Sequence, residues 1–316
     1  MFSGLKQMST HRMRNCACGR LVGCLLAGML LSIAACATEN DGSVYPVGAE
    51  TVLQGMMPAP HATGGATFTL LYSANQLDDP NGKPINMDFK VRCFANAVKV
   101  EHNWGIPVLG GNLGSTFAVP FIDEQLHGGG NSIGLSNMLI APVVVAYNKG
   151  NWHGYYQVDF YTPGAPYSKT ASINIGQHNF ALAPVGAFTY LSAEAKWEVS
   201  SKVDYMVNFK DGDTSYRSGN ELTWEYTAMR AISKKAALGF NGYLYQQTTG
   251  DQFKDIAVIG GNKGRDLAVG PQLRVFFGKH SAFAVKYFRD TLVENKPRGN
   301  GFWFETGFPL SFGKKS

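Results

Sequence analysis

Cysteine is scarce in this chain of 316 residues: it has five, and four of them lie within the first 37 residues. If that N-terminal segment is removed, only Cys93 remains. The rest of the chain is then predicted to hold neither an intrachain disulfide nor a cysteine-based metal site. It also lacks the His-Glu-x-x-His and paired Cys-x-x-Cys motifs, and its histidines are scattered. We therefore expect no enzymatic activity, no catalytic or metal-binding residues and no bound cofactor.

Long apolar runs and an excess of charge are missing as well. Beyond residue 37, no stretch approaches the 18 apolar residues of a membrane-spanning helix. Charged residues make up only 16% of the sequence, and the formal net charge is +5. Four of the 28 basic residues and none of the 23 acidic ones lie in the first 37, which leaves 24 against 23. This balance gives no support to nucleic-acid binding.

Residues 1–37 have the layout of a secretory signal peptide. Basic residues up to Arg20 precede the mostly apolar stretch 21–35, and small residues follow it. Cleavage after Ala37 fits this segment, and so does lipidation of Cys36 behind a lipobox at 33–36. Both alternatives stay open, and both take the protein out of the cytoplasm.

The final segment, 302–312, alternates apolar and small or polar residues over eleven positions, which is about the length of a tilted membrane-spanning strand. Phe302, Phe304, Phe308 and Phe312 share one face, and Glu305 lies on the other. An aromatic C-terminal strand of this kind is typical of outer-membrane barrels. The segment Phe302–Phe312 is also the expected contact of the barrel-assembly machinery.

About twelve segments are predicted as strands, near 66–76, 87–103, 110–122, 133–147, 152–161, 181–191, 195–208, 221–231, 236–247, 266–277, 281–291 and 301–312. In several of them apolar or aromatic residues alternate strictly with polar or charged ones; for example, Leu222, Trp224 and Tyr226 alternate with Glu221, Thr223 and Glu225. A polar face on so large a sheet suits an aqueous lumen. We expect an all-β fold, a transmembrane antiparallel up-and-down β-barrel of about 12 strands, with 14 as the alternative.

From residue 148 onward, the connections between the predicted strands alternate between short and long. The short ones are 148–151, 192–194, 232–235 and 278–280, and the long ones are 162–180, 209–220, 246–265 and 292–300. Outer-membrane barrels have short periplasmic turns and long external loops. We therefore predict that 163–179, 210–219 and 248–264 lie outside the cell, and that Lys149, Glu194 and Lys234 face the periplasm.

Residues 38–65, which are rich in proline and glycine, do not resemble a strand. They are expected to form either a periplasmic arm or a hatch folded into the lumen, ahead of a barrel over 66–316. Two acidic pairs, Asp78-Asp79 and Asp211-x-Asp213, could bind a divalent cation loosely, although solvated turns are the favoured interpretation.

Several motifs resemble a known family in their order and spacing. They are the stretch 208–221 (NFKDGDTSYRSGNE), the opening 39–58 with Tyr45-Pro46-Val47-Gly48, the segment 242–247 followed by Asp251, the segment 269–273 and the segment 287–299. Together they are similar to the MetA-pathway phenol degradation family, outer-membrane proteins associated with the meta pathway of phenol degradation.

The resemblance implies a porin-like outer-membrane transporter of Gram-negative bacteria, which passively takes up small hydrophobic or aromatic compounds. Its expected partners are outer-membrane lipid and such a solute. The candidate lumen-lining residues are Tyr155, Tyr161, Lys202, Asp204, Glu221, Glu225, Tyr243, Tyr245, Arg274, Lys286 and Glu305.

These candidates mix aromatic faces with charged anchors, which is typical of small-molecule sites. We expect Lys202 and Asp204 to pair with Glu198, Glu221 or Glu225 on neighbouring strands. Alternatively, the polar side chains only satisfy one another, and the protein is a structural or surface-interaction barrel with a blocked lumen.

Overall fold

The computed structural model describes residues 43–311, except 86–87, 165, 169 and 279–280. The predicted signal peptide and Cys36 lie outside the described residues. The strands are β1 (Thr63–Leu77), β2 (Val91–Val108), β3 (Gly111–Leu126), β4 (Gly130–Leu135), β5 (Leu139–Lys149), β6 (Trp152–Tyr161), β7 (Ala181–Leu191), β8 (Trp197–Asn208), β9 (Tyr216–Arg217), β10 (Glu221–Ala231), β11 (Ala236–Gln247), β12 (Gln252–Phe253), β13 (Ile256–Ala257), β14 (Arg265–Phe277), β15 (Ser281–Glu294) and β16 (Pro297–Ser311). A short 3-10 turn, η2 (Ala193–Ala195), precedes β8. No helix among the described residues is long and apolar enough to cross a membrane.

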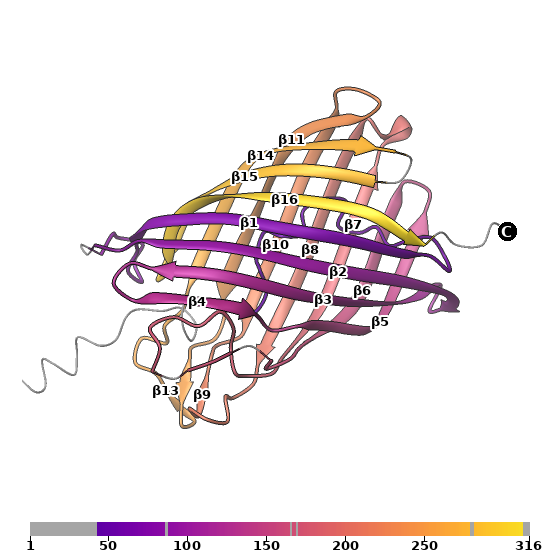
Figure 1. Ribbon diagram of the computed structural model, residues 1–316. Helices are drawn as coiled ribbons and strands as arrows, with labels where there is room; N and C mark the ends of the chain where they lie inside the picture. Colours follow the sequence, from indigo (N-terminus) through magenta and orange to yellow (C-terminus); the bar gives the residue numbers. More distant parts are fainter. Residues whose placement is uncertain (1–42, 86–87, 165, 169, 279–280, 312–316) are drawn as a thin grey trace, which may run out of the picture. The chain divides into compact units, whose positions relative to one another are not determined.

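Twelve of these strands close into an antiparallel barrel, which confirms the predicted fold. Each barrel strand pairs with its neighbours along the chain, and β1 pairs with both β2 and the last strand, β16 (Figure 1). The C-terminal strand therefore completes the wall, and β1 has no free edge.

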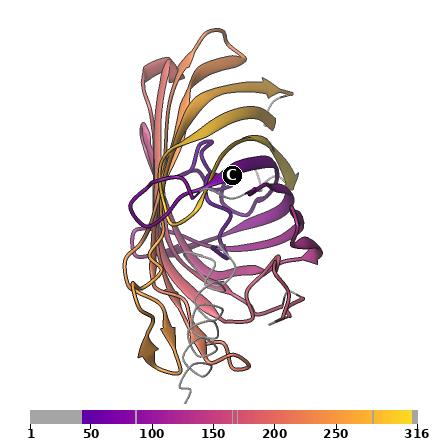
Figure 2. The ribbon, with the colours of Figure 1, turned by 90° about the vertical axis from the view of Figure 1, so that its left-hand side faces the viewer.

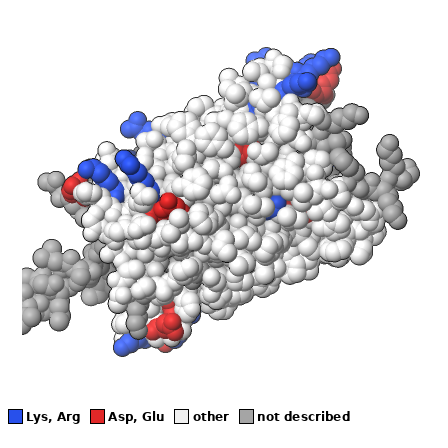
Figure 3. Space-filling view, viewed as in Figure 1, with Lys and Arg blue, Asp and Glu red and all other residues white. Residues whose placement is uncertain are grey.

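The barrel wall has its polar residues inside and its apolar residues outside. In β10, Glu221, Thr223 and Glu225 are buried, whereas Trp224 is 43% exposed on the outer face. This confirms the predicted orientation of that strand. Charged side chains gather at the two ends of the barrel and leave the band between them nearly uncharged on the visible face (Figure 3). Such a band suits contact with lipid.

The two ends of the barrel differ in their connections. At one end, here called the short-turn end, strands are joined by tight turns such as Leu109-Gly110, where both residues have positive φ, as a two-residue hairpin requires. At the other, the long-loop end, the connections 78–90, 162–180, 209–220 and 248–264 are longer. Strands β9, β12 and β13 form a small separate sheet within these loops (Figure 1).

One predicted long loop is wrong. Residues 292–300 belong mostly to β15 and β16, which are joined only by Asn295 and Lys296. Asn295 has φ +53°, a conformation that asparagine tolerates in tight hairpins. The pairing of β14 with β15 also shifts its register here, between Leu267 and Ala268. Thr291 and Leu292 are both exposed as a result, so the two-residue period is interrupted although the backbone pairing continues.

The single strand predicted over 133–147 is also wrong, because the structure divides it into β4 and β5. Strand β4 pairs with β3 from Phe121 onward, outside the twelve barrel strands, and β5 pairs with β3 only up to Ala118. Between them, the buried Asn137 side chain donates to the carbonyls of Thr162 (2.9 Å) and Gln177 (2.8 Å). These bonds hold the chain away from a straight course along β3.

Candidate functional site

Residues 43–62, here called the lumen segment, run inside the barrel ahead of β1. The segment contacts inward-facing side chains of opposite walls, and Figure 2 shows it between them. The Thr51 hydroxyl donates to Gln272 of β14 (2.9 Å), and the Gly55 amide donates to the Thr189 hydroxyl of β7 (2.9 Å). Gly55 lies so close to β7 that an added Cβ would come within about 2.5 Å of the Phe188 backbone.

A buried ionic network fixes the middle of the lumen segment. The carboxylate of Glu50 pairs with Lys99 of β2 and with Lys202 of β8, each at 2.8 Å. Lys99 also pairs with Glu101 at 2.7 Å. Burial alone would raise the pKa of Glu50, but Lys202 and Lys99 outweigh it and hold this pKa well below its usual range.

Two further anchors lie beside this network. Glu225 of β10 accepts hydrogen bonds from the Tyr45 hydroxyl (2.7 Å) and from the Gly48 amide (2.6 Å). Lys286 of β15 donates to the Ala49 carbonyl (2.5 Å) and pairs with Glu305 at 3.2 Å. Charged groups of the wall therefore hold the segment largely through its backbone.

The lumen segment separates two cavities. The loop-side cavity, about 250 Å³, is lined by segment residues 43–47. The turn-side cavity, about 540 Å³, is lined by Glu50 and by other residues up to Ala62. Among their lining residues the two cavities share only Phe68 of β1. A third cavity, of only about 40 Å³, is lined by residues of both, among them Tyr45 and Glu50 of the segment and Lys99 of the wall. The described residues therefore leave only a narrow space beside the segment at this level.

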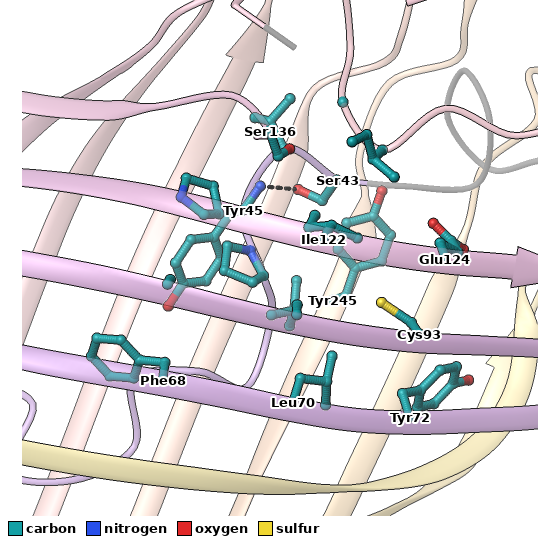
Figure 4. Close-up of a pocket in the computed structure, with 18 of the residues that line it drawn as sticks. Ser43, Tyr45, Phe68, Leu70, Tyr72, Cys93, Ile122, Glu124, Ser136 and Tyr245 are labelled. Atoms are coloured by element: carbon teal, nitrogen blue, oxygen red, sulfur yellow. Dashed lines mark hydrogen bonds between the residues drawn. The ribbon is translucent and has the colours of Figure 1, made fainter. Parts of the chain in front are cut away.

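The loop-side cavity is mostly apolar and aromatic. Phe68, Leu70 and Tyr72 follow one another along β1 and point into the same space as Cys93 and Tyr245 (Figure 4). A few polar groups lie at its edge. The Tyr72 hydroxyl donates to Asp290 (2.9 Å), and the Tyr243 hydroxyl lies 3.0 Å from both Asp290 and Asp266.

All eleven predicted lumen-lining residues are buried within the barrel: Tyr155, Tyr161, Lys202, Asp204, Glu221, Glu225, Tyr243, Tyr245, Arg274, Lys286 and Glu305. The structure brings Lys202 and Glu225 together around Tyr45. It places Tyr155 and Tyr161 in an apolar cluster with Val44 and Tyr45. The role of these residues along a solute path stays a prediction.

The expected charge partners of Lys202 and Asp204 are wrong. The ion-pair partner of Lys202 is Glu50 of the lumen segment, not an acid on a neighbouring strand. Neither oxygen of Asp204 has a hydrogen-bond partner among the described residues. Glu198 pairs with Arg274, and Glu221 accepts from Asn208 (2.7 Å).

Sequence reasoning missed Glu50, Lys99 and Tyr45. Lys99 and Glu101 share one face of a predicted strand and could have been found by their spacing. Glu50 and Tyr45 lie in a segment without periodicity, and no local signal identifies their partners.

Two groups of residues resemble an enzyme motif and a metal site, respectively. Residues 130–134 match the Gly-x-Ser-x-Gly spacing of a hydrolase elbow, but they lie within β4, whereas an elbow joins a strand to a helix. Among the described residues, His178, Asp211 and Asp213 form one group that could hold a metal ion.

A closed barrel with an apolar outer band and a polar interior defines a bacterial outer-membrane β-barrel protein. Residues 74–306 match the family described as "Putative MetA-pathway of phenol degradation", and the chain belongs to this family. No curated protein matches the chain significantly.

Among solved structures, the chain is similar to the COG4313 outer membrane channel from Pseudomonas putida F1, at 16% identity and a TM-score of 0.71. That match covers 81% of this chain and 98% of the other, so the chain has the fold of an outer-membrane channel. The CymD monoaromatic hydrocarbon channel is more distant, at 9% identity and a TM-score of 0.40 over 89% of this chain and 99% of that one. A Pseudomonas aeruginosa FadL homologue is similar at 8% identity and a TM-score of 0.40. That match covers 83% of this chain and 96% of the other.

Proposed function

We propose that the protein is an outer-membrane channel for the passive uptake of small hydrophobic or aromatic compounds, with the lumen segment as its hatch. The observation that carries the proposal is the position of this segment between two cavities, one of them lined with aromatic side chains. Membership of a family linked to phenol degradation supports the choice of solute. We place the long-loop end at the cell exterior, because barrels of this class have long external loops.

The loop-side cavity supports a solute that is small and mainly apolar. Its volume of about 250 Å³ lies below the roughly 300–1,000 Å³ of pockets for drug-sized ligands. Phe68, Leu70 and Phe288 offer apolar contacts. Asp266 also lines the cavity, and its Oδ1, which has no hydrogen-bond partner among the described residues, can accept a hydrogen bond from a solute hydroxyl. A phenol combines these two properties.

The contacts of the lumen segment support a hatch that moves as a unit. Most of its anchors are ion pairs and hydrogen bonds that involve side chains of the wall. Backbone pairing to the sheet is found at its last residues, where the His61 amide donates to the Asn103 carbonyl of β2 (2.8 Å) and the Asn103 amide donates to the Ala62 carbonyl (3.0 Å). Release of these side-chain contacts, the ion pairs of Glu50 among them, would connect the two cavities without breaking the barrel.

A second candidate, a barrel with a permanently blocked lumen that binds a partner through its loops, is favoured by the density of the buried ionic network. Swelling of liposomes that contain the full-length protein separates the two. We expect swelling with phenols and little with sugars of similar size. A barrel that passes neither solute would refute uptake.

Deletion of residues 40–62 tests the hatch directly. The expected result is a higher single-channel conductance in planar bilayers, with the barrel still folded by its heat-modifiable migration in gels. If the full-length protein already conducts like a wide porin, and the deletion changes nothing, the segment is not a hatch.

A further inference from the structure

We propose that His178, Asp211 and Asp213 form a binding site for a divalent transition-metal ion at the long-loop end of the barrel. His178 lies in the connection 162–180, and the two aspartates lie in the connection 209–220. A bound ion would therefore link two loops that are separate in the sequence. This inference does not depend on the solute or on the hatch.

The spacing of the three side chains fits metal ligands better than hydrogen-bond partners. His178 Nδ1 lies 3.4 Å from Asp213 Oδ2 and 3.7 Å from Asp211 Oδ1. Charge-assisted hydrogen bonds between nitrogen and oxygen are about 2.7–2.9 Å long. Ligand atoms at about 2.0–2.2 Å from a tetrahedral ion lie roughly 3.3–3.6 Å from each other. One potential ligand atom of each residue falls within 4.8 Å of the other two.

The burial of Asp211 supplies a second, independent observation. Its side chain is fully buried, and its Oδ1 accepts from the backbone amides of Asp213 (2.6 Å) and Thr214 (3.2 Å). Its Oδ2 and the Nδ1 of His178 are buried without a hydrogen-bond partner among the described residues. His178 Nδ1 is the unpartnered atom that faces both aspartates, at 3.4 Å and 3.7 Å. A buried polar atom without a partner is costly, and a cation held between this nitrogen and the two carboxylates would remove that cost.

The nearby basic side chains are engaged elsewhere. Lys210 pairs with Asp255 at 2.9 Å, and Arg217 donates to the Asn208 carbonyl (3.0 Å). In the described part of the chain, the ion pairs of Asp211 are with His178 alone. No lysine or arginine among these neighbours therefore neutralises the two aspartates, and a metal cation would do so.

The ligand set indicates the class of metal. One imidazole nitrogen and two carboxylate oxygens suit Zn²⁺, Co²⁺ or Mn²⁺, whereas Ca²⁺ and Mg²⁺ prefer oxygen ligands alone. Asp213 is exposed and the His178 side chain is 38% exposed, so an ion can reach the site from solvent. The Tyr167 ring stacks on His178 with centroids 5.7 Å apart and helps to fix the imidazole plane.

The test uses the full-length protein, folded in detergent without a histidine tag and titrated with Co²⁺. We expect one equivalent to bind with the visible absorption of a tetrahedral site, and Zn²⁺ to displace it while excess Ca²⁺ does not. His178→Gln and Asp213→Asn should each weaken Co²⁺ binding by at least about tenfold, since even the loss of outer-shell partners costs 10–100-fold. Asp213→Asn keeps the backbone amide that donates to Asp211. Weaker Co²⁺ binding in this variant would therefore report the loss of a ligand and not a change in the loop conformation.

The matched control is Asp255→Asn, which removes an exposed acid that pairs with Lys210 in the neighbouring loops and should leave Co²⁺ binding unchanged. Absence of Co²⁺ and Zn²⁺ binding to the wild type would overturn the proposal, and so would wild-type affinity in His178→Gln. In either case the three residues are only neighbours in the two loops. Equal competition by Ca²⁺ would overturn the assigned class of metal.

Discussion

Glu50→Gln is the most direct perturbation of the proposed hatch. The amide keeps the volume of the side chain and removes the one negative charge that the lumen segment presents to Lys99 and Lys202. Glu50 is the lumen segment's only ion-pairing acid among the described contacts. The substitution therefore acts on the contact between segment and wall, and leaves the pairing of the strands intact.

The structure sets the size of the expected effect. Removing one partner of a buried ion pair typically costs about 3–5 kcal/mol, because the other charge stays buried. Lys99 keeps Glu101 at 2.7 Å. Lys202, whose side chain is 1% exposed, loses its ion-pair partner and keeps the Tyr45 hydroxyl (3.0 Å), which donates to Glu225. The lower limit, about 3 kcal/mol, therefore applies. It corresponds to a rise of roughly a hundredfold in the ratio of released to seated segment.

Single-channel recording in planar bilayers measures this ratio as open probability. Glu101→Gln is the matched control, because it removes an acid from the same lysine but leaves the Glu50 contact in place. We expect a large rise in open probability for Glu50→Gln and little change for Glu101→Gln. Equal open probabilities in the two variants, with both barrels folded, would refute the role of the ionic network in closure.

Four further predictions follow from the same geometry. Because the pKa of Glu50 is held below its usual range, its contribution to closure is fully present above the ordinary value of about 4.3 and is lost only as pH falls through the lower pKa of the seated state. The ratio of open probabilities between Glu50→Gln and the wild type should therefore be constant between about pH 7 and pH 5, and a ratio that falls within that window would contradict the assignment. Gly55→Ala should dislodge the segment and raise conductance, because the new Cβ meets the backbone of Phe188 and Thr189, whereas Gly307→Ala, which meets nothing within 4 Å, should not. Val203→Arg, on the outer face in the middle of β8, should destabilise the barrel in lipid by about 2–4 kcal/mol, and Phe277→Arg at the end of β14 by only about 0–1 kcal/mol; equal costs in urea unfolding would place the apolar band elsewhere. A membrane-impermeant maleimide should label Ala171→Cys in intact cells but not Lys149→Cys, with the parent protein and its Cys93 as background, and the reverse pattern would invert the topology.

The fold was predictable because a membrane strand carries its information locally. Each strand must alternate between lipid and lumen, so Trp224 and Glu225 reveal their faces through their spacing alone. The burial of all eleven predicted lumen residues follows from the same periodicity. Where the period is interrupted, prediction also failed. The register of β15 shifts near Thr291, and residues 292–300 resemble a loop in sequence although most of them belong to paired strands.

The interior was decided by tertiary structure. Glu50 pairs with a lysine 152 positions away, and Glu225 receives the Gly48 amide from 177 positions away. Strand register around the whole barrel fixes the height of each inward-facing side chain along the barrel. The side chains that share the height of a segment residue become its partners. The division of β4 from β5 likewise depends on Asn137 reaching the carbonyls of Thr162 and Gln177. The sequence determined which residues face inward, and only closure of the barrel determined which of them meet, because that choice rests on contacts between residues far apart in the chain.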